Sequence, residues 1–256
     1  MFSNILISLG AGLLTLQSFI ILNLETRYET AIFVFFATLF SYNFQRLTRH
    51  KKDIEHYDSD RVIWIKKNRA FLLSLTLVSG ISTLGLTFLL NLNEIFFLVV
   101  PGIISVLYSL GSFGLRNVPS LKIVFISLVW AASAVFSTIF ISDTYQNLLI
   151  MTYVFLYIFS LCIPFDVRDL AIDDSAKKTI PQLFGIKPGI IISLVLFGLS
   201  QIVLFWITNS PWVIPISITG FILITLALKQ RKELFYSGLI DGHIIFSSLI
   251  IFISCR

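Results

Sequence analysis

The chain has 256 residues, of which 56% are apolar and 13% are charged, and its formal net charge is +5. A water-soluble domain carries about 25% charged residues, and so much apolar surface cannot be hidden in one core of this length. The composition excludes a water-soluble domain, a disordered chain, a collagen-like chain and a disulfide scaffold. It predicts an integral membrane protein.

Nine apolar runs, broken by charges or turn residues, follow one another along the chain. A helix needs about 20 mostly apolar residues to cross a bilayer, and the runs lack the alternation of an outer-membrane barrel. The first run has no basic segment before it and no cleavage site after it, so we expect a retained helix rather than a signal peptide. The sequence predicts an all-α integral membrane protein with about nine transmembrane helices, in a single domain over residues 1–256. The predicted spans are 4–24, 29–45, 70–90, 94–113, 120–141, 146–165, 188–208, 211–228 and 238–255.

The basic residues predict how these helices are oriented. With nine spans, every Lys and Arg residue except Arg27 and Arg256 falls on one side of the bilayer. Because loops rich in Lys and Arg stay in the cytoplasm, we expect the N-terminus inside and the C-terminus outside a bacterial inner (plasma) membrane. Anionic lipid headgroups account for the basic side, so no nucleic acid partner is expected. The predicted cytoplasmic loops cover residues 46–69, 114–119, 166–187 and 229–237.

One acidic cluster follows the sixth predicted span. At about 100° per residue, Asp166, Asp169 and Asp173 lie on one face of a helix, while Arg168 points away. Three carboxylates repel each other unless a cation joins them, and Mg²⁺ prefers oxygen ligands together with the phosphates of a substrate. The loop after the cluster contains Lys178, a further cation for phosphate. The pattern favours a site for Mg²⁺ and a diphosphate, and the alternative interpretation is a helix end that is polar because it emerges into water.

The acidic cluster and a second stretch resemble the UbiA-type membrane prenyltransferases. The family's second aspartate-rich motif and the loop after it are similar to Asp166-x-x-Asp169-x-x-x-Asp173 and Lys178-Thr179-Ile180-Pro181-x-x-x-Gly185. The family's Tyr and Lys/Arg stretch between the fourth and fifth helices is similar to Tyr108-Ser109, Leu115-Arg116-Asn117 and Lys122. The resemblance implies a helical bundle around a central cavity, Mg²⁺-dependent binding of an isoprenyl diphosphate, and transfer of the isoprenyl group to a lipophilic acceptor.

The first aspartate-rich motif of that family is altered in this chain. The family has Asn-Asp-x-x-Asp and another Asp four residues later, whereas the chain reads Asn43-Phe44-Gln45-Arg46-Leu47-Thr48-Arg49-His50-Lys51. Only Asn43 matches, so a second metal cluster is not expected there. Arg46 and His50 share a helical face with Asn43 and offer cations to the diphosphate instead. Each of these basic residues, taken alone, also fits the positive-inside pattern.

These interpretations together predict a membrane-embedded transferase that moves an isoprenyl group to an aromatic or other lipid-precursor acceptor. The predicted catalytic and Mg²⁺-binding residues are Asp166, Asp169 and Asp173. The predicted substrate-binding residues are Asn43, Arg46, His50, Tyr108, Arg116, Lys122, Lys178 and Asp241, the last near the start of the final span. The altered first motif motivates an alternative: a non-catalytic UbiA-like membrane protein that binds a lipid or a partner in the same cavity.

Overall fold

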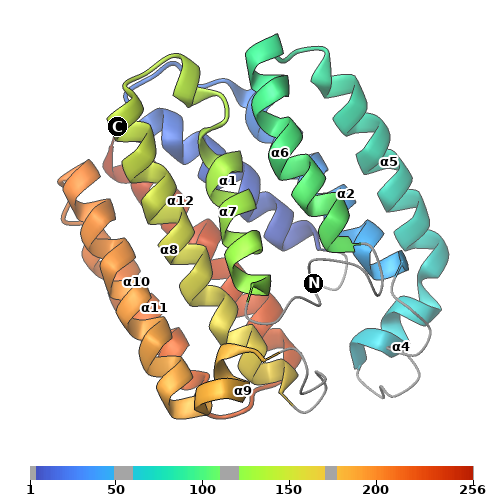
Figure 1. Cartoon of the computed structure of the whole chain (residues 1–256), viewed down its shortest axis with the longest axis vertical. Helices are drawn as coiled ribbons and strands as arrows, with labels where there is room; N and C mark the ends of the chain where they lie inside the picture. Colours follow the sequence, from blue (N-terminus) through green and yellow to red (C-terminus); the bar gives the residue numbers. More distant parts are fainter. Residues whose placement is uncertain (1–3, 49–59, 110–120, 171–177, 256) are drawn as a thin grey trace.

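Helices are the only regular elements in residues 4–48, 60–109, 121–170 and 178–255, which the computed structural model describes. Nine of these helices have 14 residues or more, and each coincides with one of the nine predicted spans (Figure 1). A π-helical segment, η5 (Phe235–Ile240), leads directly into the last of them. The nine are α1 (Ile5–Ile21), α2 (Tyr28–Thr48), α5 (Arg69–Thr87), α6 (Leu92–Ser109), α7 (Lys122–Val135), α8 (Thr144–Asp169), α10 (Ile186–Thr208), α11 (Val213–Leu226) and α12 (Asp241–Ser254).

The predicted fold class, an all-α membrane protein, is confirmed. Four helical segments of the described residues are long and apolar enough to cross a membrane, namely α5, α8, α10 and η5 together with α12. The shorter apolar helices are α1, α6, α7 and α11. The number of nine crossings, the four cytoplasmic loops and the extent of the single domain stay predictions.

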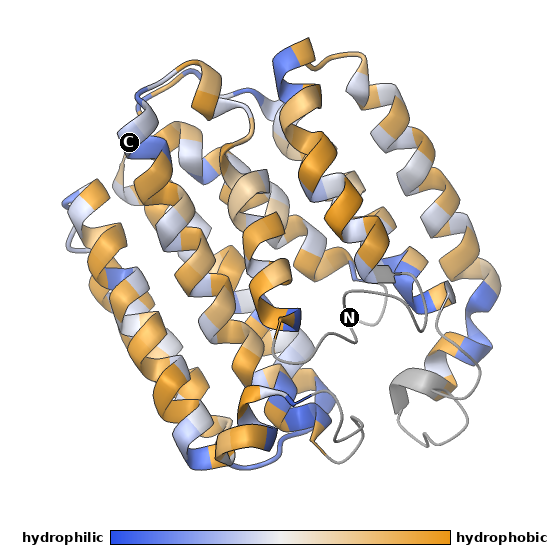
Figure 2. Cartoon of the chain, viewed as in Figure 1, coloured by the Kyte–Doolittle hydropathy of each residue, from blue (hydrophilic) through white to orange (hydrophobic). Residues whose placement is uncertain are grey.

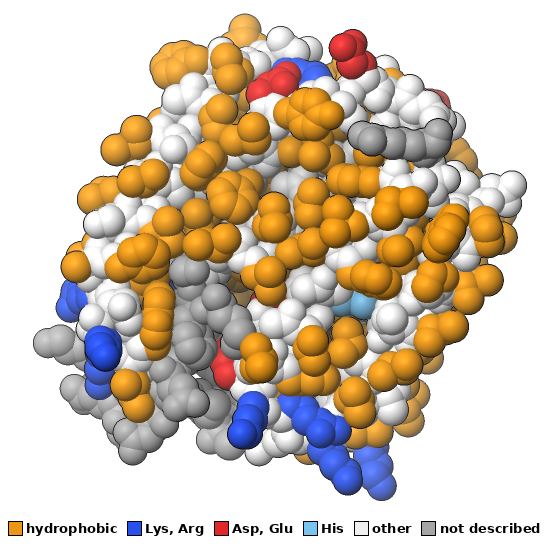
Figure 3. Space-filling model, turned by 180° about the vertical axis from the view of Figure 1, so that it is seen from behind, with side chains coloured by type: hydrophobic (Ala, Val, Ile, Leu, Met, Phe, Trp, Pro, Cys, Tyr) orange, Lys and Arg blue, Asp and Glu red, His pale blue; other side chains and the backbone are white. Residues whose placement is uncertain are grey.

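The surface of the bundle carries the apolar belt that a bilayer requires. Hydrophobic residues dominate along the helices, and hydrophilic residues concentrate near the helix ends (Figure 2). Ile81 and Leu84 of α5 and Trp206 of α10 are at least 70% exposed, and hydrophobic side chains cover the middle of the face in Figure 3. Most of the Lys and Arg side chains on that face gather toward one end. Because water does not tolerate such a surface and hydrocarbon does, the protein is an integral membrane protein.

Short elements occupy the turns between the long helices. Helix α4 (Asp60–Lys67) precedes α5, α9 (Ile180–Phe184) precedes α10, and the 3-10 turn η3 (Thr138–Phe140) separates α7 from α8. Helices α4 and α9 lie toward the same end of the bundle, whereas the C-terminus lies toward the other (Figure 1). Gly185 has a φ of +92°, which a glycine adopts without strain, and this residue turns the chain from α9 directly into α10.

Glycines allow close approach at two helix contacts. A Cβ at Gly12 of α1 would lie 2.8 Å from the Ala31 carbonyl oxygen of α2. A Cβ at Gly220 of α11 would lie 2.1 Å from the Phe197 ring of α10. Membrane helices associate through packing of this kind, because the apolar lipid supplies little hydrophobic driving force between them.

A buried hydrogen-bonded histidine joins three helices in the interior of the bundle. The Nε2 atom of His243 lies 3.1 Å from the Ile216 carbonyl oxygen of α11, which only accepts hydrogen bonds. Nε2 therefore carries the hydrogen, and Nδ1 accepts from the Tyr157 hydroxyl of α8 at 2.7 Å. Thr219 adds a contact at 3.1 Å to Nε2. Both ring nitrogens are engaged, so His243 packs as a neutral side chain that connects α8, α11 and α12.

An ion-pair cluster closes the end of the bundle opposite α4 and α9. Arg27, between α1 and α2, contacts Glu29 at 2.7 Å and Glu94 of α6 at 2.6 Å. Glu94 is 2% exposed, and it also accepts from the Asn91 backbone N–H at 2.8 Å and from the Ser137 hydroxyl. Burial opposes the charge on Arg27, but the two carboxylates outweigh burial and raise the pKa of Arg27. Arg27, which the sequence predicts on the outer side together with the C-terminal Arg256, is thus neutralised.

We expect Glu94→Ala to lower the free energy of unfolding by about 3–5 kcal/mol, because it leaves the Arg27 charge uncompensated in a partly buried cluster. Glu25→Ala, at an exposed position of the same connection, is the matched control and should change stability by about 0.5 kcal/mol or less. Denaturant unfolding in detergent measures both values. Equal effects of the two substitutions would show that the cluster does not hold this end together.

Candidate functional site

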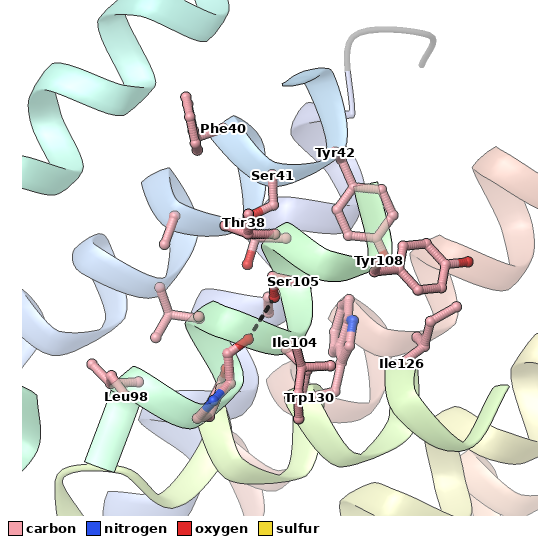
Figure 4. A pocket seen from close by; sticks show the side chains of 18 of the residues that line it. Thr38, Phe40, Ser41, Tyr42, Leu98, Ile104, Ser105, Tyr108, Ile126 and Trp130 are labelled. Atoms are coloured by element: carbon pink, nitrogen blue, oxygen red, sulfur yellow. Dashed lines mark hydrogen bonds between the residues drawn. The ribbon is translucent and has the colours of Figure 1, made fainter. Parts of the chain in front are cut away.

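A cavity of about 460 Å³ lies between α1, α2, α5, α6 and α7. Its walls are mostly apolar, and Figure 4 shows Leu98 and Ile104 among the side chains that line it. The lining positions on α2 run from Phe33 to Gln45, so the cavity extends about 18 Å along that helix at 1.5 Å per residue. A narrow apolar cavity of this length suits an extended hydrocarbon chain.

Aromatic side chains gather toward one end of this cavity. Tyr42 of α2, Tyr108 of α6 and Trp130 of α7 lie near one another in Figure 4. We call the part of the cavity formed by Gln45, Tyr108 and Phe125 its loop end, because α2 and α6 finish and α7 begins there.

Lys122 connects the loop end of the cavity to the acidic cluster. It lies four residues before Ile126, which lines the cavity, and so occupies the same face of α7 one turn further out. Its Nζ atom is 2.6 Å from Oδ1 of Asp166 on α8. Asp166 is 2% exposed and Lys122 is 16% exposed. The last turn of α8 therefore presents a buried carboxylate beside the cavity, with a cation from α7 on it.

Asp169 is held by a different cation, Arg168. The guanidinium donates from Nε to Oδ1 of Asp169 at 2.7 Å and from Nη2 to Oδ2 at 3.0 Å, a bidentate pair. It also donates from Nη1 to Oε1 of Glu233 at 3.2 Å, and it lies 5.0 Å from the Phe165 ring and 5.5 Å from the Tyr236 ring. The expectation that Arg168 points away from the cluster is wrong, because its long side chain curls toward the carboxylate of Asp169, the next residue. Arg168 thereby ties the end of α8 to η5.

The structure also describes four other predicted site residues. Asn43 is fully buried, and its Oδ1 accepts from the Asn4 side chain at 2.7 Å, so it joins α2 to the start of α1. Lys178 is exposed and has a φ of +46° in the turn before α9. Asp241, the first residue of α12, is half-buried and within electrostatic range of Arg168. Arg46 lies in the last turn of α2, near the loop end.

Three predicted site residues, His50, Arg116 and Asp173, lie outside the described residues, so their roles stay predictions. Conversely, sequence reasoning missed Tyr42 at the cavity and Glu233 beside Arg168. Tyr42 could have been found, because it precedes Asn43 and lies one turn before Arg46. Nothing near Glu233 in the sequence indicates a contact with a residue 65 positions away.

Comparisons with known proteins bear on the whole fold. No family model matches the chain, and no curated protein matches it. Among solved structures, a UbiA homologue from Aeropyrum pernix K1 is similar with a TM-score of 0.69 and 13% identity, over 96% of this chain and 98% of that chain. The fold is the UbiA fold. The resemblance seen in the sequence is thus confirmed for the arrangement of the helices.

Two further solved structures share the UbiA fold. A UbiA homologue from Archaeoglobus fulgidus bound to GPP and Mg²⁺ has a TM-score of 0.62 and 14% identity, over 98% of this chain and 95% of that chain. A structure described as digeranylgeranylglyceryl phosphate synthase has a TM-score of 0.58 and 18% identity, over 98% of this chain and 93% of that chain. These values establish the fold.

The donor atoms at the end of α8 in this UbiA fold are compatible with Mg²⁺. Among the described residues, no three His, Cys, Asp or Glu side chains come together as a metal cluster. Mg²⁺ needs no such cluster, because it commonly takes one or two carboxylates from the protein and completes its shell with water and phosphate oxygens. Asp166 and Asp169 supply two carboxylates in the last turn of α8. These residues therefore fit a Mg²⁺ that binds together with a diphosphate.

We expect Arg168→Met to lower the free energy of unfolding by about 3–5 kcal/mol, because Asp169 and Glu233 then face each other without a cation. Arg168→Lys should lose part of the stability as well, since an ammonium cannot form the bidentate pair or stack on both rings. Thermal and denaturant unfolding in detergent measure the loss. Lys232→Met, at an exposed position near η5, is the control. If Arg168→Met is as stable as this control, the connection between α8 and η5 is not what holds the cluster.

Proposed function

We propose that this protein transfers an isoprenyl group from an isoprenyl diphosphate to an aromatic or other lipid-precursor acceptor inside the membrane, with assistance from Mg²⁺. The observation that carries the proposal is the junction at Lys122. On one side of this residue lies an apolar cavity about 18 Å long, and on the other lies a buried carboxylate. An isoprenyl diphosphate has the same division into a long apolar tail and a charged head.

Solved structures with the same fold support this substrate class. The Archaeoglobus fulgidus UbiA homologue has been solved with GPP and Mg²⁺ and also with DMAPP and Mg²⁺. The second structure has a TM-score of 0.58 and 14% identity to this chain. We infer from this likeness, and from the donor atoms at the end of α8, that the chain binds an isoprenyl diphosphate with Mg²⁺ held by Asp166, Asp169 and Asp173.

The reaction breaks the bond between the isoprenyl carbon and the diphosphate oxygen. When bound, Mg²⁺ would neutralise part of the charge on the departing diphosphate. The basic residues assigned to the same role are Arg46, His50, Arg116, Lys122 and Lys178, which compensate on the side of the altered first motif. Arg suits bidentate contact with phosphate oxygens, and Lys supplies a mobile point charge.

The cavity protects the allylic cation that remains. Tyr42, Tyr108 and Trp130 lie near the loop end, where the reacting carbon would sit, and their π faces attract positive charge. The apolar walls exclude water that would otherwise capture the cation. The acceptor attacks this carbon and loses a proton, and Asp241 is assigned to the acceptor side because it lies at the start of α12 near the cluster.

The orientation of the protein in the membrane follows the basic loops, so we place this chemistry at the cytoplasmic face of a bacterial inner membrane.

We expect Asp166→Asn and Asp169→Asn each to lower turnover by about 100-fold or more, because each removes a carboxylate that positions the metal on the leaving group. Labelled isoprenyl diphosphates of several lengths, tested with a panel of acceptors with and without Mg²⁺, measure the effect. Asp143→Asn is the matched control, since Asp143 caps α8 far from the cluster and Asn caps a helix equally well.

The same assay separates the enzyme from the non-catalytic alternative. Absence of turnover in the unaltered protein with every diphosphate and acceptor, together with no stabilisation by diphosphate and Mg²⁺, would reject the enzyme. Binding of a lipid without turnover would then favour a UbiA-like protein that uses the cavity for binding alone. Full activity in Asp169→Asn would leave the reaction in place and remove this site assignment.

We expect Thr38→Phe to shift the substrate preference toward shorter isoprenyl chains, because Thr38 lines the middle of the cavity and a ring there fills space needed by a long tail. Turnover of the longest accepted substrate should fall at least about tenfold relative to the shortest. Thr152→Phe, at an exposed position of α8, makes the same replacement away from the cavity and should change neither. An unchanged length preference in Thr38→Phe would show that the tail lies elsewhere.

A further inference from the structure

We propose that Lys122 is an internal counter-ion of Asp166 that an incoming divalent cation displaces, and that the displaced ammonium then binds the diphosphate. This inference rests on the function proposed above and assigns Lys122 a second position. In the absence of metal, the ammonium neutralises the carboxylate that the metal needs. In its presence, the same ammonium contacts the substrate.

The competition follows from the contact between the two residues. The Lys122 ammonium is 2.6 Å from Asp166 Oδ1, which is the atom type that Mg²⁺ would coordinate. Two cations on one carboxylate repel each other strongly in a site that is shielded from water. Asp166 is 2% exposed, so its charge requires a cation at all times. Metal and ammonium therefore exchange at this carboxylate instead of sharing it.

The two cations of the cluster differ in the side chains that carry them. The Arg168 guanidinium pairs with Asp169 in bidentate fashion, pairs with Glu233, and lies over two aromatic rings. The Lys122 ammonium reaches Asp166 on a flexible four-carbon stem from the first turn of α7. Lys122 is the cation that is able to move, and Arg168 is the one that stays.

Among the described residues of the cluster, carboxylates outnumber cations. The carboxylates are Asp166, Asp169, Glu233 and Asp241, and the cations that pair with them include Lys122 and Arg168. A divalent cation compensates such an excess, and a diphosphate then brings new negative charge to the loop end of the cavity. Lys122 lies one turn from Ile126 on the cavity-facing side of α7, so its ammonium has only to turn toward the substrate.

Direct binding of Mg²⁺ alone to the purified full chain tests the exchange. By calorimetry, Lys122→Met should bind Mg²⁺ at least about tenfold more tightly than the unaltered protein, because no ammonium competes. Lys122→Arg should bind Mg²⁺ more weakly, since a guanidinium pairs with a carboxylate through two hydrogen bonds. With Mg²⁺ saturating, Lys122→Met should bind inorganic diphosphate about tenfold more weakly, because the displaced ammonium is missing. A purely structural lysine would not give opposite changes for metal and diphosphate.

Folding is controlled in the same experiment. Lys122→Arg keeps a cation beside the Asp166 carboxylate. Mg²⁺ should raise the unfolding temperature of Lys122→Met more than that of the unaltered protein. Lys187→Met, at an exposed position at the start of α10, removes one Lys charge near the same end and should change neither affinity. Equal Mg²⁺ affinity in Lys122→Met and in the unaltered protein overturns the exchange and leaves the proposed function intact. If Mg²⁺ binds none of the proteins, the exchange falls together with the Mg²⁺-assisted step, and the turnover assay reports on the remaining transferase activity.

Discussion

The need to neutralise charge where helices leave the membrane governs both ends of this bundle. At the end opposite α4 and α9, Arg27 and Glu94 pair at 2.6 Å, with Glu29 and Ser137 beside them, so the helices are tied together and little charge is left over. At the other end, among the residues that the structure describes near Asp166 and Asp169, carboxylates outnumber cations. The first arrangement closes the bundle, and the second attracts cations. The described parts of the two ends thus differ in their balance of charge.

The excess charge is useful because it lies next to an apolar cavity. A carboxylate in open water would gain little from a metal or a cation, since water screens it. Asp166 is 2% exposed and pairs with Lys122, which lies one turn of α7 from Ile126 in the cavity wall. A diphosphate that binds there together with a metal would therefore interact with charges that water does not screen. Its tail would lie among the side chains of α2, α6 and α7 instead of among lipid chains. The arrangement explains why an enzyme for amphipathic substrates would place its polar residues at the end of an apolar bundle.

The helices and the acidic cluster were predictable from the sequence, whereas the pairing of charges was not. Apolar runs predict helices such as α8 because length and composition alone satisfy the bilayer, and the spacing of Asp166 and Asp169 follows from the helix period. The partners of these carboxylates depend on side-chain reach: Lys122 comes from another helix, and Arg168 folds back on its neighbour. A central cavity was expected from the resemblance, but its walls were out of reach, because they come from helices whose mutual tilt no local pattern encodes.

The altered stretch on α2 becomes understandable once the cavity is considered. Phe44, at a position where the resembled family has an acidic residue, lines the cavity and stacks on Phe40 with ring centroids 5.5 Å apart. Asn43, the one matching residue, bonds to Asn4 and so contributes to helix packing. Phe40 and Phe44 thus make this part of the α2 wall apolar, and none of the α2 residues that line the cavity is a carboxylate for a second metal. A diphosphate at this site would have carboxylates for a metal on the α8 side and would depend on basic side chains for compensation on the α2 and α7 side.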